Sequence, residues 1–210
     1  MKTIMFFGDS NTWGYNPINA RRYPFDVRFT GIVSEKLSDC RIIEEGLKGR
    51  TNALSDDLQA DRNGLRSLPM LLCTHDPIDI LVIMLGTNDV KRKFHNAPTE
   101  IANGLELLIQ TAQMPLLWGG EKTPRILVVC PPGVTGNFKC SEMEGAFDLT
   151  SVEKSLQLHE AYQKIAVQYG CDYLNAMDHT GPGVCDGVHL EEEEHKKMAE
   201  ALIIKLQTMI

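Results

Sequence analysis

Short apolar segments alternate with longer segments of helical periodicity along the whole chain. Three of the short segments, IMFF, ILVIML and ILVVC, contain no polar residue, which is typical of strands that helices cover on both faces. Two further short segments, at residues 41–45 and 172–174, are also candidate strands. Together they predict five strands, at residues 3–7, 41–45, 80–85, 126–130 and 172–174.

A helical stripe of apolar side chains recurs at four places between and after these strands. The stripes begin at Phe29, Ile101, Leu158 and Met198, and each continues at spacings of three or four residues, the period of one helix face. Such alternation of strands and helices predicts an α/β fold, with a parallel sheet wrapped by helices and joined by right-handed crossovers. A length of 210 residues predicts one domain that spans residues 1–210.

Charge and composition exclude several classes of partner. The chain has 28 acidic and 21 basic residues, a net charge of -7, whereas nucleic-acid binding needs clustered basic charge. We therefore expect neither nucleic acid nor a membrane surface as a partner. The apolar run at residues 4–7 is shorter than the ~7–15-residue core of a signal peptide, which predicts a cytoplasmic protein. Its six cysteines form no CxxC pair and are expected to be reduced thiols.

Candidate chemistry follows the predicted strands, because ligands of a parallel sheet bind at the carboxyl ends of its strands. Ser10 follows the first strand and becomes a nucleophile if a base reaches it, although such residues also form ordinary turns. Gly46 and Gly49 follow the second strand and leave the backbone free to bind an oxyanion, or simply to turn. Asn88 follows the third strand and either donates to an oxyanion or caps a helix.

An acid and a histidine lie three residues apart just before the last helical stripe. Asp186 can hydrogen-bond His189 and support it as a general base. A metal site that also uses His195 is the alternative, but no third histidine or thiolate stands at a standard ligand spacing. We therefore expect no metal. A nucleophile, two oxyanion donors and an acid–base pair are all predicted at one rim of the sheet.

These residues make the sequence resemble the SGNH (GDSL-type) hydrolase superfamily. Its blocks match Gly8-Asp9-Ser10, Gly49, Gly86-Thr87-Asn88-Asp89 and Asp186-Gly187-Val188-His189, in order along the chain. The stretches FGDSNTWGYNP and IMLGTNDVK resemble its arylesterase and acyltransferase branch in particular. The resemblance implies a flavodoxin-like three-layer sandwich with a five-stranded parallel sheet. It also implies a homo-oligomer and a serine esterase that acts on small acyl esters without a cofactor, and that sometimes transfers the acyl group to alcohols.

The resemblance assigns roles to the matching residues. Ser10 is the nucleophile, His189 the base and Asp186 the residue that orients it. The oxyanion hole consists of the backbone N–H groups of Ser10 and Gly49 and the side chain of Asn88. Two positions depart from the pattern: Asn11 replaces the usual Leu, a change not expected to affect the chemistry, and Arg50 stands where many relatives carry Asp.

The substrate is expected to be a small neutral ester held in a pocket beside these residues. The candidates for its wall are Asn11, Trp13, Tyr15, Lys48, Phe138 and Phe147, although aromatic side chains pack in cores as readily as in pockets. Residues 131–151 contain three glycines, which leaves room for a mobile lid. A carbohydrate O-acetylesterase is an alternative function. A non-catalytic flavodoxin-like ligand-binding module is another, but the sequence lacks both GxGxxG and GxxxxGK[ST] phosphate loops.

Overall fold

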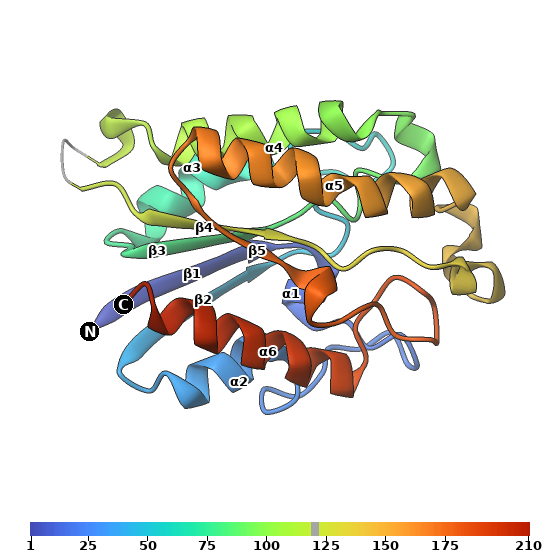
Figure 1. The fold of residues 1–210 in the computed structure, drawn as a ribbon, viewed down its shortest axis with the longest axis horizontal. Coiled ribbons are helices and arrows are strands. Elements are labelled where there is room, and N and C mark those ends of the chain that lie inside the picture. Colours follow the sequence, from blue (N-terminus) through green and yellow to red (C-terminus); the bar gives the residue numbers. More distant parts are fainter. Residues whose placement is uncertain (119–121) are drawn as a thin grey trace.

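Five parallel strands form one sheet at the centre of the molecule, in the order β2-β1-β3-β4-β5 (Figure 1). The computed structural model describes residues 1–118 and 122–210. The strands are β1 Lys2–Gly8, β2 Cys40–Gly46, β3 Ile80–Met84, β4 Arg125–Cys130 and β5 Asp172–Asn175. All five predicted strands are confirmed, and each end lies within one residue of the predicted one.

Helices cover both faces of the sheet. Helices α2 (Phe29–Lys36) and α6 (Glu192–Gln207) pack together on one face, and α3 (Gly64–His75), α4 (Pro98–Ala112) and α5 (Leu149–Gln168) lie on the other (Figure 1). The three-layer α/β sandwich predicted from the sequence is thus confirmed. Of these helices, only α3 has no predicted stripe. Pro69 interrupts its pattern, and a proline inside a helix normally signals a break.

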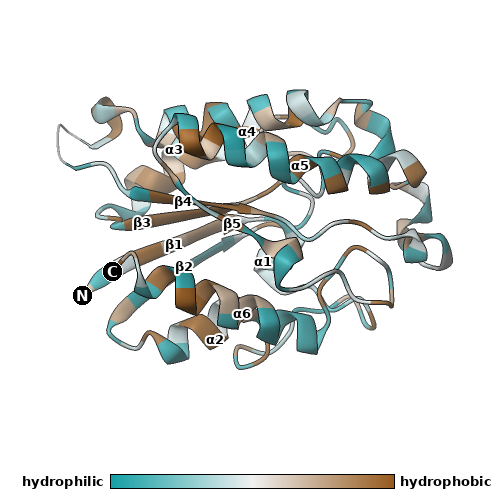
Figure 2. Cartoon of the chain, in the orientation of Figure 1, coloured by the Kyte–Doolittle hydropathy of each residue, from teal (hydrophilic) through white to brown (hydrophobic). Residues whose placement is uncertain are grey.

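The alternation of side chains along the inner strands builds two apolar cores. In β1, Met5 and Phe7 point toward α3, α4 and α5, whereas Ile4 and Phe6 point toward α2 and α6. Because successive side chains of a strand face opposite ways, a strand buried on both faces needs apolar residues at every position. Figure 2 shows the result, with hydrophobic strands between helices whose outer faces are hydrophilic.

The segments that follow β1 and β4 lie at the carboxyl edge of the sheet. The first contains the short helix α1 (Ser10–Trp13), and the second folds into the 3₁₀ helices η3 (Gly136–Cys140) and η4 (Glu142–Gly145). Further 3₁₀ helices are η1 Arg92–Phe94, η2 Pro115–Trp118 and η5 Ala176–Asp178. Movement of residues 131–151 as a lid stays a prediction.

Two further sequence expectations concern cysteines and membranes. Five cysteines are free thiols, and the side chain of Cys140 lies outside the described part of the chain. Over residues 1–118 and 122–210, no helix has the length and apolar character needed to cross a membrane.

Candidate active site

Ser10 begins helix α1 at the point where β1 leaves the sheet. The side chain of Asp9 caps this helix and accepts a hydrogen bond from the backbone N–H of Asn11 at 2.9 Å. Such caps satisfy backbone donors that a short helix cannot bond internally. The cap fixes the backbone around Ser10, and Ser10 itself is only 6% exposed.

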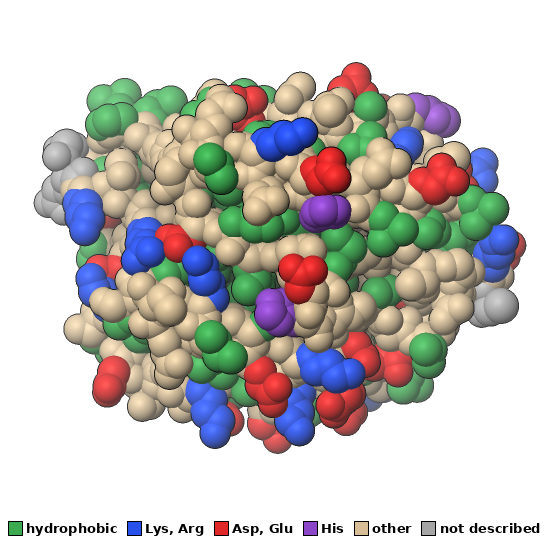
Figure 3. All heavy atoms as spheres, viewed as in Figure 1, with side chains coloured by type: hydrophobic (Ala, Val, Ile, Leu, Met, Phe, Trp, Pro, Cys, Tyr) green, Lys and Arg blue, Asp and Glu red, His purple; other side chains and the backbone are tan. Residues whose placement is uncertain are grey.

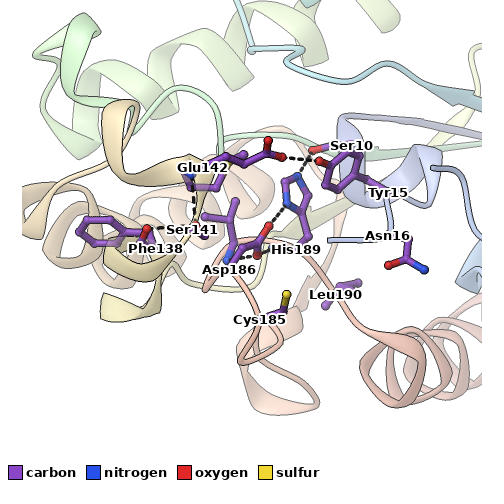
Figure 4. A network of polar contacts seen from close by, with 12 residues as sticks. Ser10, Tyr15, Asn16, Phe138, Ser141, Glu142, Cys185, Asp186, His189 and Leu190 are labelled. Atoms are coloured by element: carbon purple, nitrogen blue, oxygen red, sulfur yellow. Dashed lines mark hydrogen bonds and ion pairs between the residues drawn. The ribbon is translucent and has the colours of Figure 1, made fainter. Parts of the chain in front are cut away.

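His189 bonds Ser10 on one side and Asp186 on the other. Its Nε2 lies 2.9 Å from Ser10 Oγ, and its Nδ1 lies 2.6 Å from Asp186 Oδ2 (Figure 4). The other oxygen of Asp186 accepts from the backbone N–H groups of Val188 and His189 at 2.9 and 2.8 Å. Gly187, with a φ of 69°, makes the tight turn between acid and base in a conformation that favours glycine.

Two effects act on the carboxyl group of Asp186. Burial raises its pKa, but the hydrogen bond and the charge of His189 outweigh burial and hold the pKa below the ordinary value. The carboxylate is therefore ionised where it accepts from the imidazole. This arrangement fixes one tautomer of His189, with Nδ1 protonated and Nε2 free to accept from Ser10.

Asn88 and Gly49 approach Ser10 from β3 and β2. The side-chain amide of Asn88 donates to the backbone oxygen of Arg50 at 3.0 Å and lies 3.5 Å from Asp9 Oδ2, which fixes its orientation. Gly49 has a φ of 83°, a left-handed conformation in which a side chain is strained. Ser10, Gly49, Asn88 and His189 all line one cavity of about 320 Å³, so the structure brings four widely spaced segments together.

Three of the six residues predicted for the substrate pocket line this cavity: Tyr15, Lys48 and Phe147. The other three lie elsewhere. Phe138 is buried and belongs to the apolar core on the side of the sheet that α3, α4 and α5 cover. Trp13 packs beneath the ammonium group of Lys48, which lies 4.8 Å from its ring centre. Asn11 is buried and bonds the backbone on either side of His189.

The family model for the GDSL-like lipase/acylhydrolase matches residues 4–202 of the chain. The chain belongs to this family. The predicted membership is confirmed, and the protein is a carboxylic ester hydrolase.

Solved structures of esterases align with this GDSL-like hydrolase over its whole length. Est24, a carbohydrate acetylesterase from Sinorhizobium meliloti, is 35% identical with a TM-score of 0.94. The native M. smegmatis aryl esterase is 30% identical, also with a TM-score of 0.94. Both comparisons cover 100% of each chain. None of the curated proteins matches the chain.

Five further residues line the cavity of this GDSL-like hydrolase: Gln59, Arg62, Lys91, Met143 and Val188. Gln59 and Arg62 come from the irregular segment between β2 and α3, and Met143 comes from η4. No motif marks these segments. Lys91 lies two residues after the Gly86–Asp89 motif and Val188 lies within the Asp186–His189 motif, and these positions are the signal that could have identified them.

Tyr15 links the two long segments at the carboxyl edge of the sheet. Its ring centre lies 4.3 Å from that of His189, and its hydroxyl donates to Glu142 of η4 at 2.6 Å (Figure 4). Burial and the Glu142 carboxylate raise the pKa of Tyr15 above its ordinary value, so the phenol keeps its proton. Tyr15 therefore packs against the imidazole and fastens residues 131–151 over the cavity.

Two carboxyl groups, those of Asp9 and Asp89, are buried and do not line the cavity. Burial raises the pKa of Asp9 and raises that of Asp89 to about 7. The backbone N–H of Asn52 donates to both oxygens of Asp89, at 3.0 and 3.1 Å. Because burial disfavours a charged carboxylate, both groups are shifted toward their neutral forms.

Arg50, which departs from the family pattern, ties the ends of two strands together. Its Nη1 donates to the backbone oxygen of Gly8 at 3.0 Å and to that of Glu45. The guanidinium lies over the Phe7 ring, 4.3 Å from its centre, and burial lowers its pKa to about 10. The side chain does not line the cavity; it joins the carboxyl ends of β1 and β2.

The residues of the alternative metal site serve other purposes. His195 is fully buried, and its Nδ1 accepts a 3.3 Å hydrogen bond from the backbone N–H of Phe29. Within the described ranges, no three His, Cys, Asp or Glu side chains are grouped so that they could hold a metal ion.

Proposed function

We propose that the protein is a serine esterase that cleaves small acyl esters through an acyl-enzyme at Ser10. One observation carries the proposal: a hydrogen-bonded chain runs from Ser10 Oγ through His189 to Asp186, at 2.9 and 2.6 Å, and Ser10 and His189 line the cavity. A hydroxyl group becomes a nucleophile when an oriented base takes its proton.

The proposed first step is acylation. Ser10 Oγ forms a bond to the carbonyl carbon of the ester while His189 Nε2 accepts the hydroxyl proton. The carbonyl oxygen becomes an oxyanion, which would be bound by the backbone N–H groups of Ser10 and Gly49 and by the amide of Asn88. The intermediate then collapses, the bond to the alcohol breaks, and His189 returns its proton to the leaving oxygen.

The proposed second step releases the acyl group. Water gives a proton to His189 Nε2 while its oxygen bonds to the acyl carbon. The bond from that carbon to Ser10 Oγ then breaks and His189 returns the proton to Oγ, so the products are a carboxylic acid and free Ser10. An alcohol in place of water would give acyl transfer by the same route. His189 accepts and returns the proton in both steps, so the proposed reaction requires no cofactor.

Cavity size supports a small acyl group. About 320 Å³ lies at the lower end of ordinary ligand sites, which span ~300–1,000 Å³. Likeness to Est24, a carbohydrate acetylesterase, supports a second candidate, the removal of acetyl groups from sugars. Both candidates use the same chemistry at Ser10 and differ in the alcohol that leaves.

Hydrolysis of 4-nitrophenyl esters of increasing acyl length tests the proposal. We expect acetate to be cleaved and Ser10→Ala to abolish the cleavage. Ser34→Ala is the matched control, since Ser34 lies in α2 and does not line the cavity. Mass spectrometry after rapid quenching should find the acyl group on the peptide that contains Ser10. Full activity of Ser10→Ala would refute the mechanism.

A further inference from the structure

The charged side chains that line the cavity are all cationic. Lys48, Arg62 and Lys91 surround it together with Ser10 and His189, and no Asp or Glu of the described residues belongs to its lining. This contrasts with the chain as a whole, whose net charge is -7. It also contrasts with the surface in Figure 3, where acidic and basic side chains are intermixed.

None of these three cations forms an ion pair within residues 1–118 and 122–210. Lys48 lies over the rings of Trp13 and Tyr15, and Lys91 lies 5.9 Å from the centre of the Phe147 ring. Other cations of the molecule are paired, such as Arg28 with Glu44, Lys93 with Asp56 and Arg125 with Asp172. The cavity therefore holds positive charge that the protein itself leaves uncompensated.

Arg62 lies beside the proposed oxyanion hole. Its Cδ and Nε are each 3.4 Å from the place where a Cβ on Gly49 would lie. One guanidinium nitrogen, Nη1, donates to the backbone oxygen of Ala60 at 2.8 Å. Nε is buried and has no hydrogen-bond partner among the described residues. An unsatisfied buried donor of this kind costs stability unless a ligand accepts from it.

The nearby carboxyl groups offset little of this charge. Glu142 lies outside the cavity lining and accepts from Tyr15. Asp9 and Asp89 do not line the cavity, and burial raises the pKa of each. Burial and the neighbouring Lys93 lower the pKa of Lys91, and a bound anion would restore the favourable environment for its charge.

We infer that the cavity takes esters that carry a carboxylate, bound by Lys48, Arg62 and Lys91. The inference rests on the proposed function. It differs from the neutral ester expected from the net charge of the chain, because the substrate meets the cations that line the cavity and not the net charge of the whole protein. Arginine offers a forked pair of donors that matches a carboxylate, and lysine adds a mobile point charge. The anionic group belongs to the acyl part or to the alcohol part of the ester, and the experiment separates the two.

Two matched pairs of esters test the preference. For the alcohol side, 4-acetoxybenzoate is compared with 4-acetoxybenzamide; for the acyl side, mono-4-nitrophenyl glutarate is compared with 4-nitrophenyl pentanoate. We expect kcat/KM to favour the anionic member of at least one pair on the order of 10-fold at low salt, as electrostatic steering allows. The pair that shows the preference identifies the side that carries the carboxylate. The inference would be overturned if the ratio of kcat/KM for the anionic ester to that for the neutral ester were one or less in both pairs.

Charge-removing variants identify the residues responsible. Arg62→Gln and Lys91→Gln should each bring the anionic-to-neutral ratio closer to one. Arg66→Gln removes the same charge from α3, outside this cavity, and should keep the ratio. A ratio that is unaffected by both cavity variants, or that falls equally in Arg66→Gln, would also overturn the inference.

A binding measurement separates this inference from the proposed mechanism. Calorimetry with Ser10→Ala compares 4-hydroxybenzoate with 4-hydroxybenzamide for the alcohol side. For the acyl side it compares mono-4-nitrophenyl glutarate with 4-nitrophenyl pentanoate, which this variant is not expected to cleave. Tighter binding of the carboxylate is expected in at least one pair. If that preference appears while no ester is cleaved by the wild type, the mechanism fails and the charge recognition stands. If esters are cleaved with no preference in either assay, the inference alone fails.

Discussion

The backbone N–H of Leu190 donates a 2.9 Å hydrogen bond to the side-chain oxygen of Asn11. The amide nitrogen of the same side chain lies 3.4 Å from the backbone oxygen of Val188 and donates to it. Val188 and Leu190 flank His189, and Asn11 follows Ser10. One buried amide therefore fastens the proposed base to the proposed nucleophile across 177–179 residues of sequence.

Replacing Asn11 by leucine should slow turnover more than it weakens substrate binding. Leucine has a similar volume, but it leaves the N–H of Leu190 and the oxygen of Val188 without their partner. This prediction departs from the sequence expectation that the identity of residue 11 does not affect the chemistry. We expect kcat on 4-nitrophenyl acetate to fall on the order of 10- to 100-fold, as small displacements of reacting groups cost. The free energy of unfolding should fall by about 1–3 kcal/mol.

Asn137→Leu is the matched control, since Asn137 also donates to a backbone oxygen, that of Val184 at 3.1 Å, but on the exposed surface. It should leave kcat unchanged. If Asn11→Leu lowers stability and leaves kcat at the wild-type value, the amide supports the fold without positioning His189.

Truncating Asn88 should remove one oxyanion donor. Asn88→Ala is expected to lower kcat by about 100- to 1,000-fold, the usual effect of such a loss. KM should change little, because the donor acts on charge that develops in the transition state. Asn63→Ala serves as the control: Asn63 donates to a backbone oxygen, that of Ala53, in the same way but lies outside the cavity. Equal losses in both variants would contradict a specific role of Asn88.

The sequence predicted the sheet and the proposed catalytic residues for physical reasons. Runs such as ILVIML leave no polar face, so a doubly covered strand is the structure they favour. Ser10, Asn88 and His189 follow strand ends or precede a helix, and the parallel topology brings such positions to one edge. Local composition and the order of strands and helices were therefore sufficient to predict the sheet and to select these residues as catalytic candidates.

The wall of the cavity was predicted only in part, because residue type does not tell which way a side chain points. Trp13 and Phe138 were expected in the pocket, yet one packs under Lys48 and the other joins the core. Arg62 and Met143 were missed, since irregular segments carry no periodicity from which their path can be predicted. Helix α3 was missed because Pro69 breaks its pattern.

Removing the guanidinium of Arg50 should destabilise the carboxyl edge of the sheet. Arg50→Met keeps the length of the side chain but leaves the backbone oxygens of Gly8 and Glu45 without their donor. Because hydrogen bonds from a charged donor contribute about 1.5–3 kcal/mol, we expect the unfolding free energy to fall by about that amount in a urea titration. Arg41→Met, an exposed change on β2, should stay within about 0.5 kcal/mol of the wild type. Equal urea midpoints for Arg50→Met and Arg41→Met would contradict a stabilising role of the Arg50 guanidinium.

Shortening Met143 should widen the acyl specificity. Met143 is half-buried and lines the cavity, so Met143→Ala adds space to the cavity. The ratio of kcat/KM for 4-nitrophenyl hexanoate to that for acetate should rise several-fold, since about one methylene in a fitted pocket contributes roughly 1–3 kcal/mol. Leu149→Ala, at the exposed start of α5, should leave the ratio unchanged. An unchanged ratio in Met143→Ala would place the acyl group elsewhere in the cavity.

His195 makes the fold sensitive to acid. The imidazole stacks on Phe29 with a ring-centre distance of 5.7 Å, and burial lowers its pKa to about 3 from an ordinary 6.5. The unfolded chain therefore binds a proton between these two values and the folded chain does not. The contribution of His195 to stability is complete above pH 6.5 and is lost progressively as the pH falls toward 3. Asp89 acts in the opposite sense, because its pKa in the folded protein, about 7, lies above the ordinary 3.8.

A comparison of variants isolates the histidine from this opposing effect. His195→Asn keeps an acceptor for the N–H of Phe29 and removes the titration, while Asp89 contributes equally to both proteins and cancels in the difference. Between pH 7 and pH 5, the wild type should lose about 2 kcal/mol of unfolding free energy relative to His195→Asn, at about 1.4 kcal/mol for each pH unit below 6.5. Urea titrations at a series of pH values measure this difference. His95→Asn, at an exposed position, is the control, and its unfolding free energy should follow that of the wild type at every pH. If the difference in unfolding free energy between the wild type and His195→Asn does not change with pH, the imidazole of His195 binds a proton as readily in the folded chain as in the unfolded chain.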